Sequence, residues 1–203
     1  MIRPIFTFTI FMITLGPIKT IPGFFLLTKD LDAKPARTLA IKAALIATAV
    51  ALFIAFGVHE TAAAWGISID GLRIAGGLLL FAGARDIISH FNEPGAVPAT
   101  LGPNPAVTPL AIPLIVTPWG VVAILIFTEI ARDDLYETAV VIGMMLFMMA
   151  LNLIGMLLAR PIMRLVGIGT FQVLGWIFAV LQATLAVEAI LVSLRSLGLL
   201  PPA

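Results

Sequence analysis

The chain contains the stretch Thr14-Leu15-Gly16-Pro17-Ile18-Lys19-Thr20-Ile21-Pro22-Gly23-Phe24, which interrupts an apolar run long enough to cross a membrane. Two prolines, two glycines and a lysine stand in it. Proline removes a backbone donor and clashes with the preceding turn, and hydrocarbon offers no other partner to the freed carbonyl groups. Such a break is stable at membrane depth only where it faces protein or a water-filled cavity. The stretch is therefore a candidate binding site.

A second break follows in the stretch Pro109-Leu110-Ala111-Ile112-Pro113-Leu114-Ile115-Val116-Thr117-Pro118-Trp119-Gly120. Pro113 stands 96 positions after Pro17 (113 − 17). Pro118 stands at the same offset from Pro22. These offsets predict matching proline breaks in the first and fourth membrane helices. The alternative is two unrelated proline kinks, since proline is frequent in membrane helices.

The composition is that of an integral membrane protein. Of the 203 residues, 61% are hydrophobic and 11% are charged, whereas soluble domains have roughly 45–50% and 25%. The net charge of +1 predicts no nucleic-acid partner. There is no cysteine for a disulfide, a thiolate metal site or a nucleophile, and no motif typical of metal or catalytic sites occurs. We expect no enzymatic activity, no metal and no cofactor.

The hydrophobic pattern predicts six membrane-spanning helices. A connection rich in proline and glycine, residues 92–106, separates the first three spans (1–91) from the last three (107–203). A weak match of residues 72–76 with residues 171–175 supports a repeat. Three spans per half place the halves in opposite orientation, so we predict one all-α polytopic membrane domain made of two inverted three-helix repeats. The predicted spans are Ile5–Leu27, Thr38–Val58, Gly66–Ser89, Ala106–Thr128, Thr138–Ala159 and Gly167–Leu194.

The lysines and arginines of the short loops predict the orientation in the membrane. Seven lie in or beside the loops after spans one, three and five, against three or four on the other side. Basic loops stay in the cytoplasm, so both termini are expected outside it. The seven are Lys29, Lys34, Arg37, Lys42, Arg85, Arg160 and Arg164; the others are Arg3, Arg132 and Arg195, with Arg73 if it lies outside the core.

Three stretches of the sequence are candidate family motifs: Gly66-Ile67-Ser68-Ile69-Asp70-Gly71-Leu72-Arg73-Ile74-Ala75-Gly76-Gly77-Leu78-Leu79-Leu80, Thr108-Pro109-Leu110-Ala111-Ile112-Pro113 and Met163-Arg164-Leu165-Val166-Gly167. They resemble signatures of the MarC family, and the resemblance covers nearly the whole chain. It implies a six-span bacterial or archaeal inner-membrane protein. Some members of that family are transporters of small neutral amino acids, reported as proton-coupled; others, once linked to antibiotic resistance, have no clear role.

Both breaks depart from the pattern of that family. The first break usually reads like Asp-Pro-x-Gly-Asn-x-Pro; here Gly16, Lys19 and Thr20 stand at the Asp, Gly and Asn positions. The second usually reads like Gly-Pro-Gly, and here it is Thr117-Pro118-Trp119. Loss of the acid argues against proton coupling through that position. The gain of a lysine and a tryptophan changes the substrate or fills the pocket.

We expect the two breaks to face each other near the midplane and to hold a zwitterion. The second half-helices are predicted to start at Thr20–Phe24 and Thr117–Val121, where free amide groups suit a carboxylate. Carbonyl groups near Leu15 and Val116 would take an ammonium group. Small neighbouring residues would favour a small side chain. The candidate substrate-binding residues are Gly16, Pro17, Lys19, Thr20, Pro22, Gly23, Gly76, Gly77, Pro113, Thr117, Pro118, Trp119 and Gly120.

Lys19 is the sharpest single candidate, because a lysine in the membrane interior costs about 2.5–3.5 kcal/mol on insertion scales. Three hypotheses remain open. It holds the substrate carboxylate, it titrates and replaces a coupling proton or sodium ion, or it extends along the break to the cytoplasmic surface. Glu188 in the sixth span is a second coupling candidate, although a place at the outer end of the span is favoured.

Other polar residues of the spans have expected structural roles. Asp70 and Arg73 are predicted to pair at a helix start. Gln172, Gln182 and Asn152 are predicted to bridge helices. Three threonine hydroxyls at the breaks either bind ligand or bond back to a helix carbonyl: Thr14, Thr20 and Thr117.

The function predicted from these features is alternating-access transport of small neutral amino acids, similar to glycine or alanine, across the bacterial inner membrane. Two alternatives remain: export or carriage of another small solute, and a non-transporting membrane scaffold whose breaks serve only helix packing. A wet cavity at both breaks favours transport, whereas a dry crossing filled by side chains favours the scaffold. The expected partners are the substrate and the lipid bilayer, and no oligomeric state is predicted.

Overall fold

The computed structural model describes residues 4–57, 64–92 and 102–201, and all the regular secondary structure in this part of the chain is helical. Residues 93–101, which make up most of the predicted connection between the halves, lie outside the described residues. The elements are α1 (Pro4–Leu15), α2 (Pro17–Thr28), α3 (Ala33–Gly57), α5 (Ile69–Asn92), η1 (Ala106–Ile115), α6 (Pro118–Ala131), α7 (Leu135–Leu157) and α8 (Ala159–Ser196).

The helices include several that can cross a membrane. Four helical segments of the described chain are long and apolar enough, and a fifth qualifies if η1 and α6, bent by 60°, form one span. The all-α membrane architecture expected from composition is thereby confirmed. The predicted third span corresponds to α5, which is not among the five. It carries Asp70 and Arg73 near its start and Arg85 and Asp86 further along.

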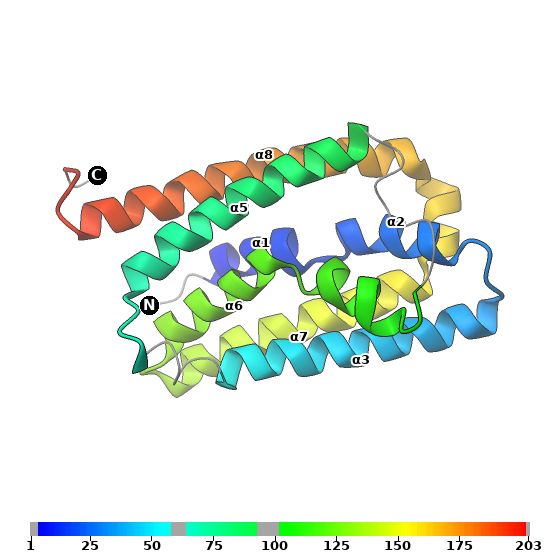
Figure 1. Ribbon diagram of the computed structural model, residues 1–203, viewed down its shortest axis with the longest axis horizontal. Helices are drawn as coiled ribbons and strands as arrows, with labels where there is room; N and C mark the ends of the chain where they lie inside the picture. The colour runs from blue at the N-terminus through cyan, green and yellow to red at the C-terminus, as the bar shows by residue number, and fades with distance from the viewer. Residues whose placement is uncertain (1–3, 58–63, 93–101, 202–203) are drawn as a thin grey trace.

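The broken helices lie between two pairs of long helices (Figure 1). On one side α5 and α8 lie side by side and form the most extensive helix contact of the molecule. On the other side α3 packs on α7. The segments α1, α2, η1 and α6 contact one or both pairs. This arrangement places both breaks in the middle of the molecule.

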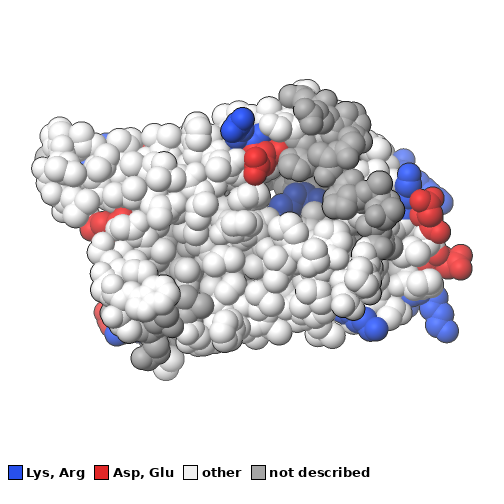
Figure 2. Space-filling model, viewed as in Figure 1, with Lys and Arg blue, Asp and Glu red and all other residues white. Residues whose placement is uncertain are grey.

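The surface is suited to a bilayer. Figure 2 shows charged side chains gathered mainly at the two ends of the molecule, with few in the middle. Large apolar side chains of the long helices are exposed instead, including Phe53 at 68%, Leu78 at 62% and Val180 at 63%. Such a band is what lipid tails contact.

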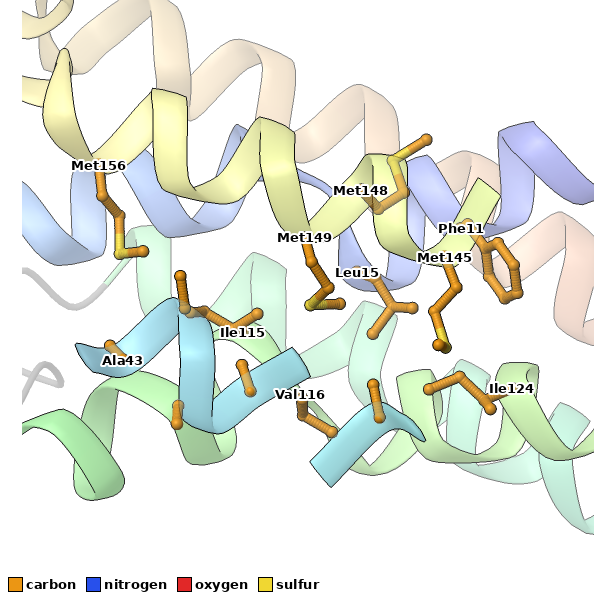
Figure 3. Close-up of a cluster of buried hydrophobic side chains, with 14 of the residues drawn as sticks. Phe11, Leu15, Ala43, Ile115, Val116, Ile124, Met145, Met148, Met149 and Met156 are labelled. Carbon is orange, nitrogen blue, oxygen red and sulfur yellow. The ribbon is translucent and has the colours of Figure 1, made fainter. Parts of the chain in front are cut away.

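Small residues and methionines make up much of the core. Along α3 all the buried residues except Ile54 are alanines, which allow close helix approach. From α7, Met145, Met149 and Met156 extend toward α3 and the ends of α1 and η1 (Figure 3). Met148 is also fully buried. The flexible methionine side chain fills irregular spaces, so these buried methionines pack the core.

The structure corrects the register of the first break. The second half-helix starts at Pro17 rather than Thr20, with Gly16 as its extended N-terminal cap (φ −73°, ψ 167°). Proline suits the first helical turn because its missing amide is unpaired there anyway. Pro22 lies inside α2, and Pro113 lies inside η1. Pro118 is the first residue of α6, so Pro17 and Pro118 are the prolines that start helices, and the pairing of Pro17 with Pro113 at an offset of 96 does not match the observed helix starts.

The predicted fourth span begins with irregular backbone. η1 consists of wide turns interrupted by extended conformations at Thr108 (φ −126°, ψ 122°) and Ile112 (φ −132°, ψ 123°). Each of these residues precedes a proline, which disfavours the helical region for the residue before it. η1 packs on α2 and α3, which supply protein contact to this irregular backbone.

An arginine of α8 joins the end of α2 to the start of the last helix. The Arg160 guanidinium donates to Thr28 O (3.2 Å) and to Leu31 O, so it satisfies carbonyls at and beyond the end of α2. We expect Arg160→Leu to lower the free energy of unfolding in detergent by about 1.5–3 kcal/mol, the range for hydrogen bonds from a charged group. Arg164→Leu is the matched control, because Arg164 is exposed on the same helix. Equal losses in both variants would contradict the assignment.

Candidate functional site

The two helix breaks meet directly. Thr117 lies at the second break with an extended backbone (φ −88°, ψ 159°) and precedes α6. Its hydroxyl donates to Thr14 O, in the last turn of α1, at 3.1 Å. The expected meeting of the two breaks is therefore found, through a side chain of one break and a carbonyl of the other.

The Thr117 hydroxyl makes all three hydrogen bonds that a hydroxyl group can make. The Oγ1 atom donates to Thr14 O and accepts from Gly120 N at 3.1 Å, which caps the start of α6. It also accepts from Lys19 Nζ at 3.2 Å. A hydroxyl has one donor and two acceptor positions, so all three are used. Thr117 is 3% exposed and joins three segments at one point.

The point where the two breaks meet, at Thr14 and Thr117, is called the crossing. Lys19 extends into it from the first turns of α2. Its ammonium group donates to Thr14 O and to Thr117 Oγ1. It also lies 5.7 Å from the centroid of the Trp119 ring, within the range of a cation–π interaction. The hypothesis that Lys19 extends to the cytoplasmic surface is wrong, because its charged end is held between the breaks. No carboxylate of the described residues forms an ion pair with it.

The starts of the two second half-helices differ. Thr117 caps α6 through Gly120 N, whereas Gly16 has no side chain and leaves α2 without a side-chain cap. The first amides of a helix have no partner within the helix and carry partial positive charge. The start of α2 therefore combines uncapped amides with the nearby Lys19 ammonium group.

Glycines allow the close approach of segments at the crossing. A Cβ at Gly16 would lie 2.0 Å from Met12 O, so the acid usual in the family at this position does not fit the backbone seen here. A Cβ at Gly120 would lie 2.6 Å from Leu15 Cδ2. At Gly23, further along α2, a Cβ would lie 2.8 Å from a methyl group of η1. These three candidates set how closely the broken segments pack.

Several other candidates lie away from the crossing or have different partners. Gly76 packs against Val122 of α6, and Gly77 packs against α8, so both permit helix contacts. Pro22 and Pro113 lie inside their helical segments. Glu188 pairs with Arg195 at 3.7 Å and its side chain is 53% exposed.

Two buried amides join helices at and beside the breaks. Asn152 Nδ2 donates to Leu15 O, the last carbonyl of α1, at 2.6 Å and to Met148 O at 2.8 Å. Gln182 Nε2 donates to Leu80 O at 2.8 Å and so joins α8 to α5. The predicted bridging roles of Asn152 and Gln182 are confirmed.

Asn152→Leu is expected to loosen the first break. The change leaves Leu15 O without its amide donor, and interhelical hydrogen bonds in membranes are worth roughly 0.6–2 kcal/mol. A fall of that size in the free energy of unfolding in detergent is the expected result, with Asn152→Gln as the variant that keeps an amide. Unchanged stability in Asn152→Leu would contradict a supporting role at the break.

Two further polar residues or pairs have partners that were considered in the sequence analysis. Asp70 and Arg73 form an ion pair at 3.5 Å near the start of α5, as predicted. Thr14 Oγ1 donates to Ile10 O at 2.8 Å, which is the back-bonded alternative. Thr117 behaves differently, since its hydroxyl connects the two breaks.

The contact between Trp119 and α5 could not be read from the sequence. A Cβ at Gly83 would lie 2.6 Å from the Trp119 ring and 2.7 Å from Gln182 Nε2. The indole therefore lies between Lys19 on one side and the α5–α8 pair on the other. The only sequence signal was the small residue itself, because nothing local indicates which helix a glycine faces.

Several of the residues named above, and Thr20 next to Lys19, carry buried polar atoms without partners. They have no hydrogen-bond partner among the described residues, and such atoms are rare in native proteins unless water or a ligand satisfies them. The crossing and its neighbourhood therefore have unused hydrogen-bonding capacity. These atoms include Thr20 Oγ1, Trp119 Nε1, Asn152 Oδ1 and Gln182 Oε1.

Comparison with known proteins places the chain among membrane proteins of one family. Residues 3–197 match the family described as "MarC family integral membrane protein". A "UPF0056 membrane protein" of Archaeoglobus fulgidus is 27% identical over 187 residues, covering 90% of this chain and 87% of the relative. One from Buchnera aphidicola is 26% identical over 161 residues, covering 79% and 80%.

A relative from Escherichia coli (strain K12), "UPF0056 inner membrane protein YhgN", is 29% identical over 109 residues, covering 53% of this chain and 54% of the relative. No solved structure matches this protein. The match over nearly the whole length, the apolar helices and the paired proline breaks agree with one another: the chain belongs to the MarC family of integral membrane proteins.

Proposed function

We propose that this protein is a secondary transporter of small neutral amino acids that works by alternating access. The observation that carries the proposal is the meeting of the two breaks at the Thr14 carbonyl, the Thr117 hydroxyl and the Lys19 ammonium group. Non-helical backbone at membrane depth is tolerated where it is buried in protein or lines a water-filled cavity. Secondary transporters bind their substrates at such discontinuous helices.

The charge at the crossing supports a substrate with a carboxylate. Lys19 has no acidic partner among the described residues, and the uncapped start of α2 adds partial positive charge. A carboxylate bound there would supply the missing counter-charge. The ammonium group of the substrate then needs an acceptor other than Thr14 O, and the unpartnered Gln182 Oε1 is one.

The starts of corresponding elements support an inverted repeat. Pro17 and Pro118 each begin a second half-helix, at an offset of 101 (118 − 17). Gly66 before α5 and Gly167 within α8 stand at the same offset (167 − 66), and both have positive φ values, 66° and 77°. Two halves of three spans would place both termini on one side, outside the cytoplasm by the distribution of basic residues.

Counterflow in proteoliposomes tests this function. The vesicles are loaded with unlabelled glycine, alanine or serine in a sodium-free N-methylglucamine medium, and the entry of labelled alanine is followed. We expect saturable exchange by the wild type and at least a tenfold lower rate for Lys19→Met, because the variant removes the cation that would bind the carboxylate. Lys42→Met is the matched control, since Lys42 is an exposed lysine of α3.

The outcomes separate the parts of the proposal. If labelled alanine shows no exchange against any of the three amino acids, the proposed substrate class is wrong. If Lys19→Met exchanges as fast as the wild type, Lys19 does not bind the substrate. Exchange with a different small solute would identify a carrier of another specificity.

A scaffold without transport activity is the second candidate function. It is favoured by the filling of the crossing with the Lys19 and Trp119 side chains. In that case Lys19→Met would change the thermal stability of the purified protein while no tested solute exchanged.

A further inference from the structure

We propose that the Lys19 ammonium group takes the place of the metal cation that drives transport in many carriers with broken helices, so that exchange by this protein requires neither sodium nor potassium. The inference rests on the proposed function and adds the coupling behaviour of the same site. It takes up the hypothesis, left open by the sequence, that Lys19 replaces a coupling ion.

The first argument is the position of the ammonium group. Thr14 O is one of the last four carbonyls of α1, which have no amide partner within the helix and lie at its negative end. Discontinuous membrane helices use such carbonyl ends to coordinate coupling cations. Lys19 Nζ is bound to this carbonyl and to a second oxygen, Thr117 Oγ1 at 3.2 Å. Two oxygens that could coordinate a metal ion are thus already bound to a cation.

The second argument is that two of the other three terminal carbonyls of α1 are also used. Met12 O accepts from Gly16 N at 3.1 Å. Leu15 O accepts from Asn152 Nδ2 at 2.6 Å. The Trp119 ring centroid lies 5.7 Å from the ammonium group, and the ring attracts a cation without supplying an oxygen ligand. A metal ion would therefore have to displace Lys19 to obtain Thr14 O.

The third argument is electrostatic. The crossing contains the Lys19 charge and, within the described residues, no carboxylate paired with it. A metal ion beside Lys19 would be a second positive charge at close range in a medium of low dielectric, where like charges repel strongly. Because the lysine is covalently attached, its charge does not cross the membrane with the substrate. We therefore expect the protein to exchange a substrate molecule on one side of the membrane for one on the other side, without moving a metal ion.

The variants Lys19→Met and Lys19→Gln test the idea, since each removes the charge and keeps a long side chain. The Thr14 and Thr117 oxygens then become available to a small cation. In counterflow, the wild type is expected to exchange alanine at rates within twofold in sodium, potassium and N-methylglucamine media. Lys19→Met should be at least tenfold slower in N-methylglucamine and recover at least fivefold in sodium.

A binding measurement independent of transport uses the apparent Tm of the purified protein in detergent, comparing sodium with N-methylglucamine chloride at equal ionic strength. Sodium at ten times its Kd should raise the Tm of Lys19→Met by about 3–6 °C. The wild type and Lys42→Met should show no such shift. Adding Thr117→Ala to Lys19→Met should abolish it, because the site loses its hydroxyl ligand.

Different results contradict the inference about Lys19 and the proposed transport function. A wild type whose exchange falls more than tenfold without sodium and potassium overturns it. So does a sodium shift that is absent from both Lys19→Met and Lys19→Gln. If the wild type exchanges no amino acid in any medium, the proposed function fails, and the Tm comparison still shows whether Lys19 occupies a cation site.

Discussion

Thr117→Val is expected to lower the free energy of unfolding by about 2–4 kcal/mol and to slow exchange by about 100-fold. Valine keeps the shape of threonine but has no hydroxyl. The start of α6 loses its cap, which costs ~1 kcal/mol. The hydrogen bond between the hydroxyl and the charged Lys19 ammonium group is also lost, which costs about 1.5–3 kcal/mol, while Thr14 O keeps its bond from Lys19. Lys19 loses one of its two oxygen partners, so the ammonium group is no longer fixed between the breaks.

The measurements are denaturant unfolding in detergent and alanine counterflow, each with two controls. Thr117→Ser keeps the hydroxyl and should stay within tenfold of the wild-type rate. Thr48→Val removes a hydroxyl that only bonds back to Ala44 O at 2.7 Å within α3, so it should change stability by less than 1 kcal/mol or so. If Thr117→Val behaves like Thr48→Val, the hydroxyl at the second break does not hold the crossing together.

The two breaks could be predicted from the sequence because they follow from properties of single residues that hold in any fold. Proline cannot donate a backbone hydrogen bond wherever it stands, and a lysine in an apolar run needs a partner in any fold. These two facts were sufficient to select residues 14–24 and 109–120 and to expect that they meet. The Asp70–Arg73 pair was also predictable, because residues three apart share a helix face.

The register of the repeat was not predictable from proline spacing. The offset of 96 rested on prolines alone, and a proline inside a helix looks the same in the sequence as a proline at a helix start. The structure separates them, since Pro17 and Pro118 begin helices while Pro22 and Pro113 do not. The error also moved the expected start of α2 from Pro17 to Thr20.

The direction of the Lys19 side chain and the contacts of Trp119 depend on tertiary structure. Lys19 and Thr117 are 98 residues apart, and Trp119 meets a glycine of α5. No periodicity within one helix specifies which residue of another helix it will face. For the same reason the sequence could not show what Gly76 and Gly77 face: it shows that they are small, but the helix packing decides that Val122 and Ile190 lie opposite them.

Gly83→Val is expected to have the second large effect, because it removes the space that Trp119 occupies. The first added carbon would already lie 2.6 Å from the indole ring and 2.7 Å from Gln182 Nε2. Overpacking of this kind costs roughly 1–3 kcal/mol and occasionally more. The indole can relieve the overlap only by moving, which would end its contact with the Lys19 ammonium group. We therefore expect lower stability together with at least tenfold slower exchange.

A background with Trp119 as the sole tryptophan (Trp65→Phe, Trp176→Phe) lets its fluorescence report the displacement. Gly83→Val should shift the emission and Gly143→Val should not, since a Cβ at Gly143 meets nothing within 4 Å.

Adding Trp119→Phe should recover part of the stability of Gly83→Val, because a smaller ring leaves room for the new methyl groups. Recovery of stability without recovery of exchange would assign the indole a direct part in transport. Failure of the smaller ring to recover stability would mean that the glycine matters for its contact with Gln182 instead.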